Sequence, residues 1–293
     1  MKNTPFNDIP FEQQYSKEIG LLIVAALKED IGMGDFSGLS CLSPSLKGTA
    51  QLIVKQNCVL AGLAMAKKIF YQFDPALELE CYHQDGDKVA QGSTALKVTG
   101  LSQSILATER LVLNCMQRMS GIASMTHELQ SLIAHTPCKI LDTRKTTPNF
   151  RVAEKWAVAI GGGVNHRMGL YDTVMLKDNH IDFCGGVSKA IEKTKNYLNT
   201  HHKVLPIIVE CRNLEEVNAC MAYPDLHRIL LDNMDLDLLR EAVALIDGSI
   251  PTEASGNITS ETLVQVAETG VDFVSMGAIT YSAPIVDMSL KVL

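Results

Sequence analysis

Short apolar runs that each lead into a polar residue recur along the chain from Cys138 onward. There are six such runs, separated by stretches with helical periodicity: CKILD, DTVML, PIIV, RILL, SIPT and VDFVSM. The polar positions Glu210, Asp232, Glu253 and Ser275, at or near the ends of the last four runs, are 22, 21 and 22 residues apart. One strand, one loop and one helix occupy about that length. The pattern therefore predicts parallel strands buried on both faces, in an α/β barrel or an open doubly wound sheet.

The N-terminal part of the chain has a different pattern, in which strand-like and helical segments are mixed. Residues 13–29 have the period of an amphipathic helix, and a glycine-rich loop is predicted at 32–38. Between residues 47 and 100 the runs GTAQLIVKQ, LELECYH and TALKVTG are typical of strands, with a helix predicted among them at 61–73. A long helical stretch covers 104–135. The sequence thus predicts an α+β module of about 100 residues ahead of the strand-helix region.

Composition and charge narrow the class of protein. The 293 residues are 46% hydrophobic and 20% charged, which is ordinary for a globular chain and excludes a disordered or coiled-coil protein. The net charge of 26 − 33 = −7 argues against non-specific nucleic-acid binding but is compatible with a local basic pocket. The eight cysteines form no Cys-x-x-Cys pair or zinc spacing, and the sequence shows neither a signal peptide nor a membrane span. We expect a cytoplasmic protein with reduced thiols that binds neither nucleic acid nor membranes.

A first cluster of cations stands at the end of the first of these strands. Asp142 is followed by Thr143, Arg144 and Lys145, shortly before Pro148, which could open a helix. An arginine fork matches a carboxylate or phosphate bidentately, and a neighbouring lysine adds a point charge. The alternative is a solvated turn with surface charges.

A second cluster follows three consecutive glycines at 161–163, where His166 and Arg167 stand just ahead of the next predicted strand. Glycines let a ligand approach the backbone closely. The alternative is a helix C-cap followed by a flexible loop. Because Lys177 adds a further cation at the next strand end, we favour an anion-binding site.

Carboxylates and small-residue turns occupy the remaining strand ends. Glu210 and Asp232 carry the hard oxygen ligands that hold Mg²⁺ together with substrate phosphates, although either could instead form a structural salt bridge. The turns at 255–257 and 275–278 could bind a phosphate through backbone N–H groups, as late loops of α/β barrels often do, or could be ordinary turns. Because the carboxyl ends of parallel strands meet at one face, we predict a cationic face suited to a multiply anionic substrate.

Several longer segments resemble one enzyme family. The runs ERLVLNCMQRMSGIAS, ILDTRKTTP, GGGVNHRMGLYDTVMLKDNHI, ILLDN, EASGNI and TGVDFVSMGAIT are together similar to quinolinate phosphoribosyltransferase, the carboxylating nicotinate-nucleotide pyrophosphorylase. The resemblance implies an incomplete, about seven-stranded α/β barrel at 116–280 and an N-terminal α/β sandwich domain at 1–115, joined by 281–293. It implies transfer of phosphoribosyl from 5-phosphoribosyl 1-pyrophosphate to quinolinate with loss of CO₂, giving nicotinate mononucleotide for NAD biosynthesis. It also implies Mg²⁺ as cofactor and a homodimer or a larger assembly of dimers.

The resemblance also assigns roles to individual positions. The implied quinolinate-binding residues, in addition to Thr143 in the same segment, are Arg144, His166, Arg167 and Lys177, with Arg110 reaching in from the neighbouring subunit. The implied catalytic residues are Lys145 and Lys177 on the sugar pyrophosphate and Glu210 and Asp232 on the metal side. The implied phosphate-binding turns contain Ser255, Gly256, Asn257, Ser275 and Gly277. The sequence departs from the family at Asn149, where glycine is usual, and at Ile208, where a second glutamate is usual.

Two other functions remain open. One is a relative on the same fold that ribosylates nicotinate or another mono-acid, or that is associated with molybdenum transport. The other is a non-catalytic protein that binds anions. The paired cationic clusters favour a diacid, and acids beside a phosphate site favour an enzyme.

Overall fold

The computed structural model describes residues 10–293, which form two compact units. The first unit comprises residues 10–127, 146–162 and 279–293, and the second comprises 128–145 and 163–278. The polar N-terminus predicts no signal peptide, and its residues 1–9 lie outside the described part of the chain. Residues 146–162 belong to the first unit, whereas the resemblance places them in the barrel domain. The domain boundary expected between residues 115 and 116 stays a prediction.

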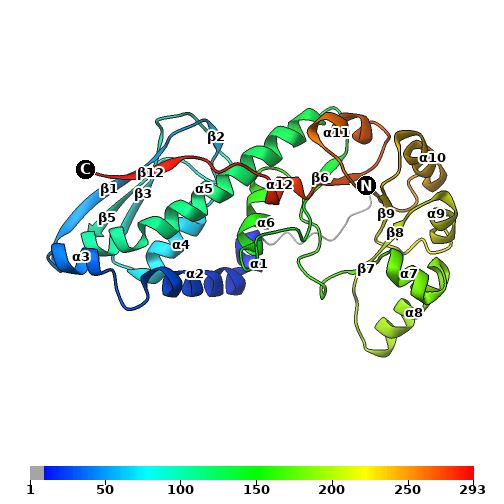
Figure 1. Ribbon diagram of the computed structural model, residues 1–293, viewed down its shortest axis with the longest axis horizontal. Helices are drawn as coiled ribbons and strands as arrows, with labels where there is room; N and C mark the ends of the chain where they lie inside the picture. Colours follow the sequence, from blue (N-terminus) through cyan, green and yellow to red (C-terminus); the bar gives the residue numbers. More distant parts are fainter. Residues whose placement is uncertain (1–9) are drawn as a thin grey trace. The chain divides into compact units, whose positions relative to one another are not determined.

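The first unit is built on a four-stranded antiparallel sheet in the order β12-β1-β5-β3 (Figure 1). Its strands are β1 (Lys47–Val54), β3 (Glu78–Cys81), β5 (Thr94–Leu101) and β12 (Met288–Val292), and a small second sheet pairs β2 (Cys58–Val59) with β4 (Lys88–Val89). In β1 the side chains of Ala50, Leu52 and Val54 are buried and alternate with half-buried positions, as in a strand with one face on a core. Val292 lies opposite Ala50 in the register of β12 and β1. The C-terminal segment therefore completes this sheet.

Helices cover this sheet and extend the unit. They are α1 (Phe11–Gln14), α2 (Ser16–Ile31), α3 (Phe36–Cys41), α4 (Leu63–Phe73), α6 (Arg151–Ile160) and the larger part of α5 (Ser102–Leu132). The helices predicted at 13–29, 61–73 and 104–135 are confirmed as α2, α4 and α5 within a few residues. The loop predicted at 32–38 is wrong in part. Helix α3 begins there because Asp35 caps it by accepting the Ser37 N–H at 3.1 Å.

A buried ion pair fixes residues 146–162 within the first unit. Glu154 of α6 is fully buried and accepts hydrogen bonds from the Arg118 guanidinium of α5 at 3.0–3.1 Å. The same carboxylate accepts the backbone N–H and the hydroxyl of Thr147 at 3.1 and 2.8 Å. Arg118 also donates to the carbonyls of Ala283, at 3.0 Å, and Thr280. These bonds tie α5, α6 and the C-terminal segment together.

The second unit is a parallel sheet of six strands in the order β6-β11-β10-β9-β8-β7. The strands are β6 (Lys139–Leu141), β7 (Val174–Leu176), β8 (Ile207–Cys211), β9 (Arg228–Asp232), β10 (Thr252–Ser255) and β11 (Phe273–Ser275). They confirm all six runs read from the sequence. A single parallel bridge between Leu141 and Val164 adds a seventh position at the β6 edge. The sheet is the incomplete, barrel-like one expected.

Helices alternate with these strands. They are α7 (Asp178–Cys184), α8 (Val187–Thr200), α9 (Leu214–Cys220), α10 (Leu236–Ile246), α11 (Ser260–Ala267) and α12 (Ala278–Tyr281), the last of which continues into the first unit. The parallel register places Ser255 opposite Asp232 and Ser275 opposite Leu141. The carboxyl ends of the strands are therefore level with one another, which places the polar residues that follow them along one edge of the sheet.

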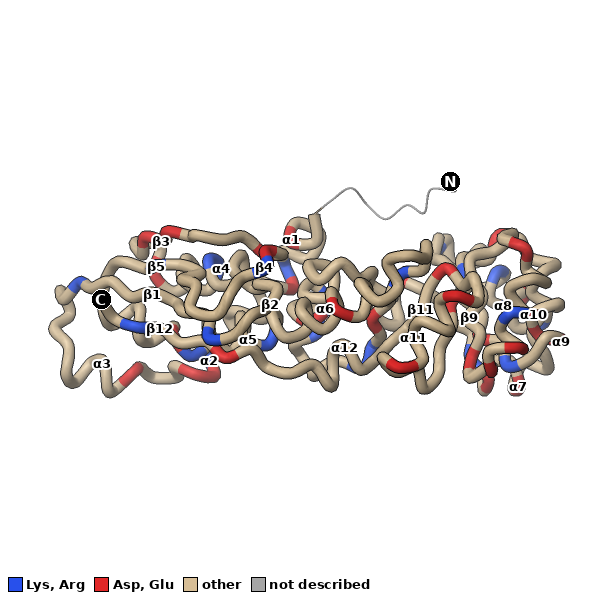
Figure 2. The backbone as a smooth tube through the Cα atoms, turned by 90° about the horizontal axis from the view of Figure 1, so that it is seen from above, with Lys and Arg blue, Asp and Glu red and all other residues tan. Residues whose placement is uncertain are grey.

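The charged residues are spread over both units. Figure 2 shows Lys and Arg interspersed with Asp and Glu in the first unit and around α7–α10 of the second. All eight cysteines are free thiols. Among residues 10–293, none of the helices combines the length and the apolar composition that crossing a bilayer requires.

Candidate active site

Most of the predicted site residues lie at or just after the carboxyl ends of the parallel strands of the second unit. After β6 come Thr143, Arg144 and Lys145; after the Val164 bridge come His166 and Arg167; after β7 comes Lys177. The last residues of β9, β10 and β11 are Asp232, Ser255 and Ser275, and Glu210 is the penultimate residue of β8. Arg110 is an exposed residue of α5 in the first unit.

Lys177 and Glu210 form an ion pair across the neighbouring strands β7 and β8. The distance from Lys177 Nζ to Glu210 Oε2 is 2.7 Å. The Lys177 side chain is about half exposed (47%), whereas the Glu210 side chain is 8% exposed. Lys177 is also the N-cap of α7, where its backbone N–H donates to His180 Nδ1 at 3.0 Å. The structural salt bridge that was the alternative for Glu210 is therefore present. It holds the partly exposed Lys177 amine at the strand ends.

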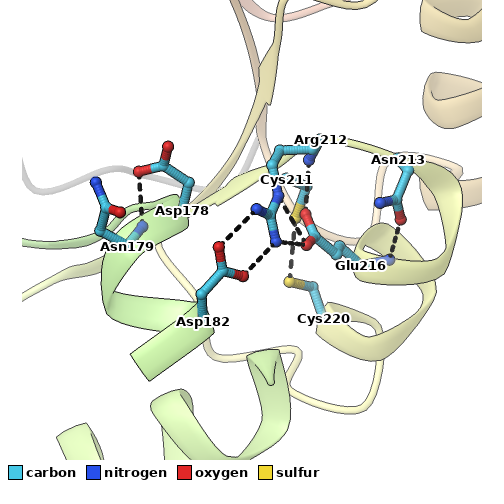
Figure 3. Close-up of polar contacts among 8 residues, drawn as sticks. All are labelled: Asp178, Asn179, Asp182, Cys211, Arg212, Asn213, Glu216 and Cys220. Carbon is cyan, nitrogen blue, oxygen red and sulfur yellow. Dashed lines mark hydrogen bonds and ion pairs between the residues drawn. The ribbon is translucent and has the colours of Figure 1, made fainter. Parts of the chain in front are cut away.

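Arg212 connects the helix that follows Lys177 to the loop that follows Glu210 (Figure 3). Its guanidinium donates to both carboxylate oxygens of Asp182 on α7, at 3.0 and 2.8 Å, and to Glu216 on α9. Its backbone N–H donates to Glu216 Oε2 at 2.7 Å. Hydrogen bonds from Arg212 lower the pKa of Asp182. This bidentate contact holds α7, whose N-cap is Lys177, against the loop that follows β8.

Asp142 orients the segment that carries His166. Its side chain is fully buried at the end of β6, where Oδ2 accepts from Asn165 Nδ2 at 2.7 Å and Oδ1 accepts the His166 N–H at 2.8 Å. A buried carboxylate needs such donors, because an unpaired buried ion costs on the order of several kcal/mol. The bonds therefore fix the backbone at residues 165–166 beside β6.

The Arg144 and Arg167 guanidiniums are close enough to influence each other. Burial and the charge of Arg144 lower the pKa of Arg167, while Asp172 opposes this shift. Arg167 Nη1 donates to the carbonyl of Thr173, just ahead of β7, at 3.1 Å. Two like charges held near one another in a partly buried place favour an anion between or beside them. This agrees with a site for a substrate with more than one carboxylate.

His166 is buried against a charged pair inside the sheet. Its Nε2 lies 3.3 Å from Glu253 Oε2, and this oxygen accepts a hydrogen bond from Arg228 Nη1 at 2.8 Å. Its Nδ1 accepts the backbone N–H of Arg167 at 2.7 Å. Burial alone would raise the pKa of Glu253, but His166 and Arg228 hold it at about 2. Both ring nitrogens of His166 thus face protein groups, and its role as a substrate-binding cation stays a prediction.

The glycine triplet has a structural explanation for two of its members. Gly161 caps α6, and a Cβ there would lie 2.5 Å from the carbonyl oxygen of Ala123 on α5. Gly162 has φ 88°, the left-handed conformation that glycine adopts without penalty. The helix-cap alternative therefore accounts for Gly161 and Gly162. The approach of a ligand is not needed to explain either glycine.

The turn after β10 borders a cavity of about 470 Å³. Ser255, Gly256 and Asn257 form one wall, and both apolar and polar residues of α10 and α11, among them Leu236, Arg240 and Gln265, line other parts. Five of the cations predicted for the site lie in the second unit, and none of these five lines the cavity. The cavity therefore extends from the predicted phosphate turn and is not assigned to quinolinate.

The two departures from the family pattern have simple local consequences. Asn149 has φ 62°, a left-handed conformation that asparagine adopts more readily than most other non-glycine residues. Ile208 is buried within β8, so Glu210 is the single carboxylate of that strand. Asn149 therefore adopts a conformation that glycine also adopts, and Ile208 leaves one acid on β8.

Sequence reasoning missed the pairing of Arg228 with Glu253. The signal was present, because Arg228 begins the otherwise apolar run RILL and Glu253 stands in a predicted buried strand, between Thr252 and Ala254. A charged residue in a buried strand requires a partner. The pattern does not say which residue that partner is, since the two positions lie on separate strands.

Comparison with known proteins agrees with this architecture. Residues 35–120 match the family described as "Quinolinate phosphoribosyl transferase, N-terminal domain", and residues 122–291 match the corresponding C-terminal domain. A relative from Nicotiana tabacum, "Quinolinate phosphoribosyltransferase [decarboxylating] 2b, mitochondrial", is 45% identical over 282 residues, covering 91% of this chain and 80% of the relative. A relative from Synechocystis, "Probable nicotinate-nucleotide pyrophosphorylase [carboxylating]", is 42% identical over 269 residues, covering 91% of this chain and 90% of the relative.

Solved structures give the same result. The nicotinate-nucleotide pyrophosphorylase of Francisella tularensis has a TM-score of 0.88 to this chain at 36% identity, covering 98% of this chain and 100% of that one. The resemblance read from the motifs is therefore confirmed. This chain belongs to the quinolinate phosphoribosyltransferase family.

Proposed function

We propose that this chain transfers phosphoribosyl from 5-phosphoribosyl 1-pyrophosphate to quinolinate with decarboxylation, giving nicotinate mononucleotide, pyrophosphate and CO₂. Membership of the family supports the reaction class, and relatives 45% identical carry this activity in their names. The observation that carries the proposal is the Lys177–Glu210 ion pair at the strand ends, where Arg144 and Arg167 also lie. This arrangement provides cations for a diacid and an amine beside a carboxylate in one unit.

Quinolinate carries two carboxylates, so its site requires at least two cationic groups in fixed geometry. Arg144 and Arg167 supply two guanidinium forks, each able to bind one carboxylate bidentately. Arg167 is already held through its bond to the Thr173 carbonyl. A fork that is held before substrate arrives loses less entropy on binding, which favours a planar, rigid diacid.

In the proposed reaction the pyridine nitrogen attacks C1′ of the sugar as pyrophosphate leaves. The ribosyl carbon becomes cation-like while negative charge builds on the leaving group. Lys177 and Lys145 stabilise that charge, and Glu210 and Asp232 stabilise the ribosyl cation. The ribosylated nitrogen is positive and accepts the electron pair released when the adjacent carboxylate departs as CO₂, after which a proton takes the vacated carbon. No organic cofactor is required.

Mg²⁺ is part of the proposal as the cofactor. Within residues 10–293 no group of three or more His, Cys, Asp or Glu side chains could hold a metal ion. Mg²⁺ commonly takes one or two carboxylates and completes its shell with waters and substrate phosphates. Glu210 and Asp232, at the ends of adjacent strands, would hold it. When bound, it supplies charge neutralisation for the pyrophosphate.

The roles expected for Thr143, Ser275 and Gly277 remain predictions.

The test of the proposed function uses quinolinate labelled in the carboxylate next to the ring nitrogen. With 5-phosphoribosyl 1-pyrophosphate and Mg²⁺, we expect release of labelled CO₂ and pyrophosphate in equal amounts. Nicotinate is the matched control, because it lacks this carboxylate, and we expect no pyrophosphate release from it. Turnover of nicotinate at the same rate would favour the mono-acid alternative. Binding of both substrates without pyrophosphate release would favour the non-catalytic protein.

A shared site in a homodimer is the second part of the proposal, with Arg110 reaching the neighbouring subunit's site. Arg110 is exposed on α5, as a residue that enters a neighbour must be. We expect Arg110→Ala and Lys177→Ala to be inactive alone. Mixed one to one and reassembled, they should recover about a quarter of the original activity, since half of the dimers are mixed and each has one intact site. Self-mixed samples of each variant are the controls. No recovery in dimers shown to be mixed would contradict sharing.

A cytoplasmic location stays a prediction. Several plant relatives are named mitochondrial or chloroplastic, and fractionation of the source cells is the measurement that decides for this chain.

A further inference from the structure

Asn233, the residue after Asp232, connects the ends of β9 and β10. Its backbone N–H donates to the Ser255 carbonyl at 2.8 Å. Its side-chain Nδ2 donates to Asp232 Oδ2 at 2.7 Å, and its Oδ1 accepts from Asn257 Nδ2 at 3.2 Å. One amide side chain therefore contacts both a carboxylate proposed for the metal side and the turn proposed for the 5′-phosphate.

The fit between these two turns is also steric. Asn233 has φ 53° and Asn257 has φ 50°, so both are non-glycine residues in the left-handed region. A Cβ on Gly256 would lie 2.2 Å from Asn233 Oδ1. The Asn233 side chain thus occupies the space that glycine at 256 leaves open. An uncommon conformation that two turns support together is a reason to look for a role in the site.

We infer that Asn233 is a positioning residue for the sugar-phosphate end of the substrate, holding the Asp232 carboxylate and the 255–257 turn at a fixed separation. The inference rests on the proposed function, in which both groups act on 5-phosphoribosyl 1-pyrophosphate. The pyrophosphate at C1 and the phosphate at C5 are joined by one ribose ring, so their separation is nearly constant. A site for both ends gains from parts that are already at that separation before binding.

The principal test is Asn233→Gly, which keeps the left-handed backbone and its bond to Ser255 but removes the side chain. We expect the KM for 5-phosphoribosyl 1-pyrophosphate to rise about 10-fold, because two hydrogen bonds are lost. The Kd for ribose 5-phosphate, measured by titration calorimetry without quinolinate or metal, should rise similarly. The KM for quinolinate should change less than about 2-fold. A general loss of structure would raise both KM values together.

A second variant keeps the test decisive if Asn233→Gly does not fold. Asn233→Asp retains the shape and the acceptor for Asn257, but places a second carboxylate against Asp232, which no longer receives a hydrogen bond. We expect the KM for the sugar pyrophosphate to rise at least as much as in the glycine variant. The matched control is His202→Gly, since His202 is an exposed left-handed residue (φ 51°) in the loop before β8, at the amino ends of the strands. We expect all three constants to be unchanged in it.

Two results would overturn the inference. One is an Asn233→Gly enzyme whose sugar-pyrophosphate KM and ribose 5-phosphate Kd both stay within about 2-fold of the unaltered chain. The other is an equal rise in the KM for quinolinate. Failure of the proposed function would look different, because the unaltered chain would then release no CO₂ from quinolinate. In that case the ribose 5-phosphate titration still decides whether Asn233 positions the turn.

Discussion

Lys177→Ala is expected to lower kcat/KM for quinolinate turnover by at least roughly 10²–10³-fold while the protein stays folded. The amine lies 2.7 Å from Glu210 and the Lys177 side chain is 47% exposed, so the amine is held in place on a side chain that solvent reaches. Its removal takes away a preorganised cation and leaves a buried carboxylate whose charge would repel pyrophosphate. Steady-state assay of CO₂ release measures the loss, and circular dichroism checks the fold.

The matched control for this variant is Lys195→Ala. Lys195 also forms an ion pair across two elements, with its Nζ 2.5 Å from Asp225 Oδ1, but it lies on α8 and not at a strand end. Exposed pairs of this kind contribute about 0–1 kcal/mol to stability, so we expect unchanged activity and nearly unchanged stability. Turnover by folded Lys177→Ala within about 10-fold of the unaltered chain would refute the role of Lys177.

The strands and the side of the sheet that carries the site could be predicted from the sequence because both depend on local pattern. Each strand is a short apolar run, and the polar positions at the ends of the last four runs recur every 21–22 residues. This spacing predicted that Glu210 and Asp232 lie at the ends of successive parallel strands. The observed register, with Ser255 opposite Asp232, follows from this regularity. The long helix α5 and the strands of the first unit were predictable for the same reason.

The contacts that hold the site in place could not be predicted in this way. The Asn233 side chain contacts Asn257, and Arg212 contacts Asp182, which lies 30 residues earlier in the chain. Such contacts depend on which loops become neighbours after folding. A single sequence gives the residue types but not the partners. The left-handed conformation of Asn233 is similarly a property of two turns that fit each other, because nothing in the pattern ILLDN distinguishes it from an ordinary strand end.

The second large effect is expected for stability when the buried carboxylate at position 253 is neutralised. Glu253→Gln should lower the free energy of unfolding by roughly 3–5 kcal/mol, since it leaves the Arg228 guanidinium buried without its counter-charge. The two side chains are 3% exposed or less, and Arg228 lies over the Phe273 ring at 4.1 Å, so water does not replace the lost partner. Urea unfolding followed by circular dichroism at neutral pH measures the change.

The same carboxylate predicts a pH dependence. Its pKa is about 2 in the folded protein and 4.5 as the ordinary value, so between these values the unfolded chain binds more protons than the folded one. The contribution of Glu253 to stability is therefore complete above about pH 4.5 and is lost as the pH falls towards about 2. The stability of the unaltered chain should fall more steeply with acid across this window than that of Glu253→Gln, in which this group does not titrate.

Two further variants separate loss of the ion pair from simple disturbance of β10. Arg228→Met combined with Glu253→Gln removes both charges and should be more stable than Glu253→Gln alone, because no uncompensated ion remains in the sheet. Glu268→Gln neutralises an exposed carboxylate paired with His135 and should change the free energy of unfolding by less than about 0.5 kcal/mol.

If the double variant is less stable than the single one, Arg228 is not the group that Glu253 neutralises, and the cost arises instead from the contact with His166. In that case Glu253→Gln should also weaken quinolinate binding, because the orientation of the His166 ring, and with it the Arg167 backbone that donates to it, would no longer be fixed.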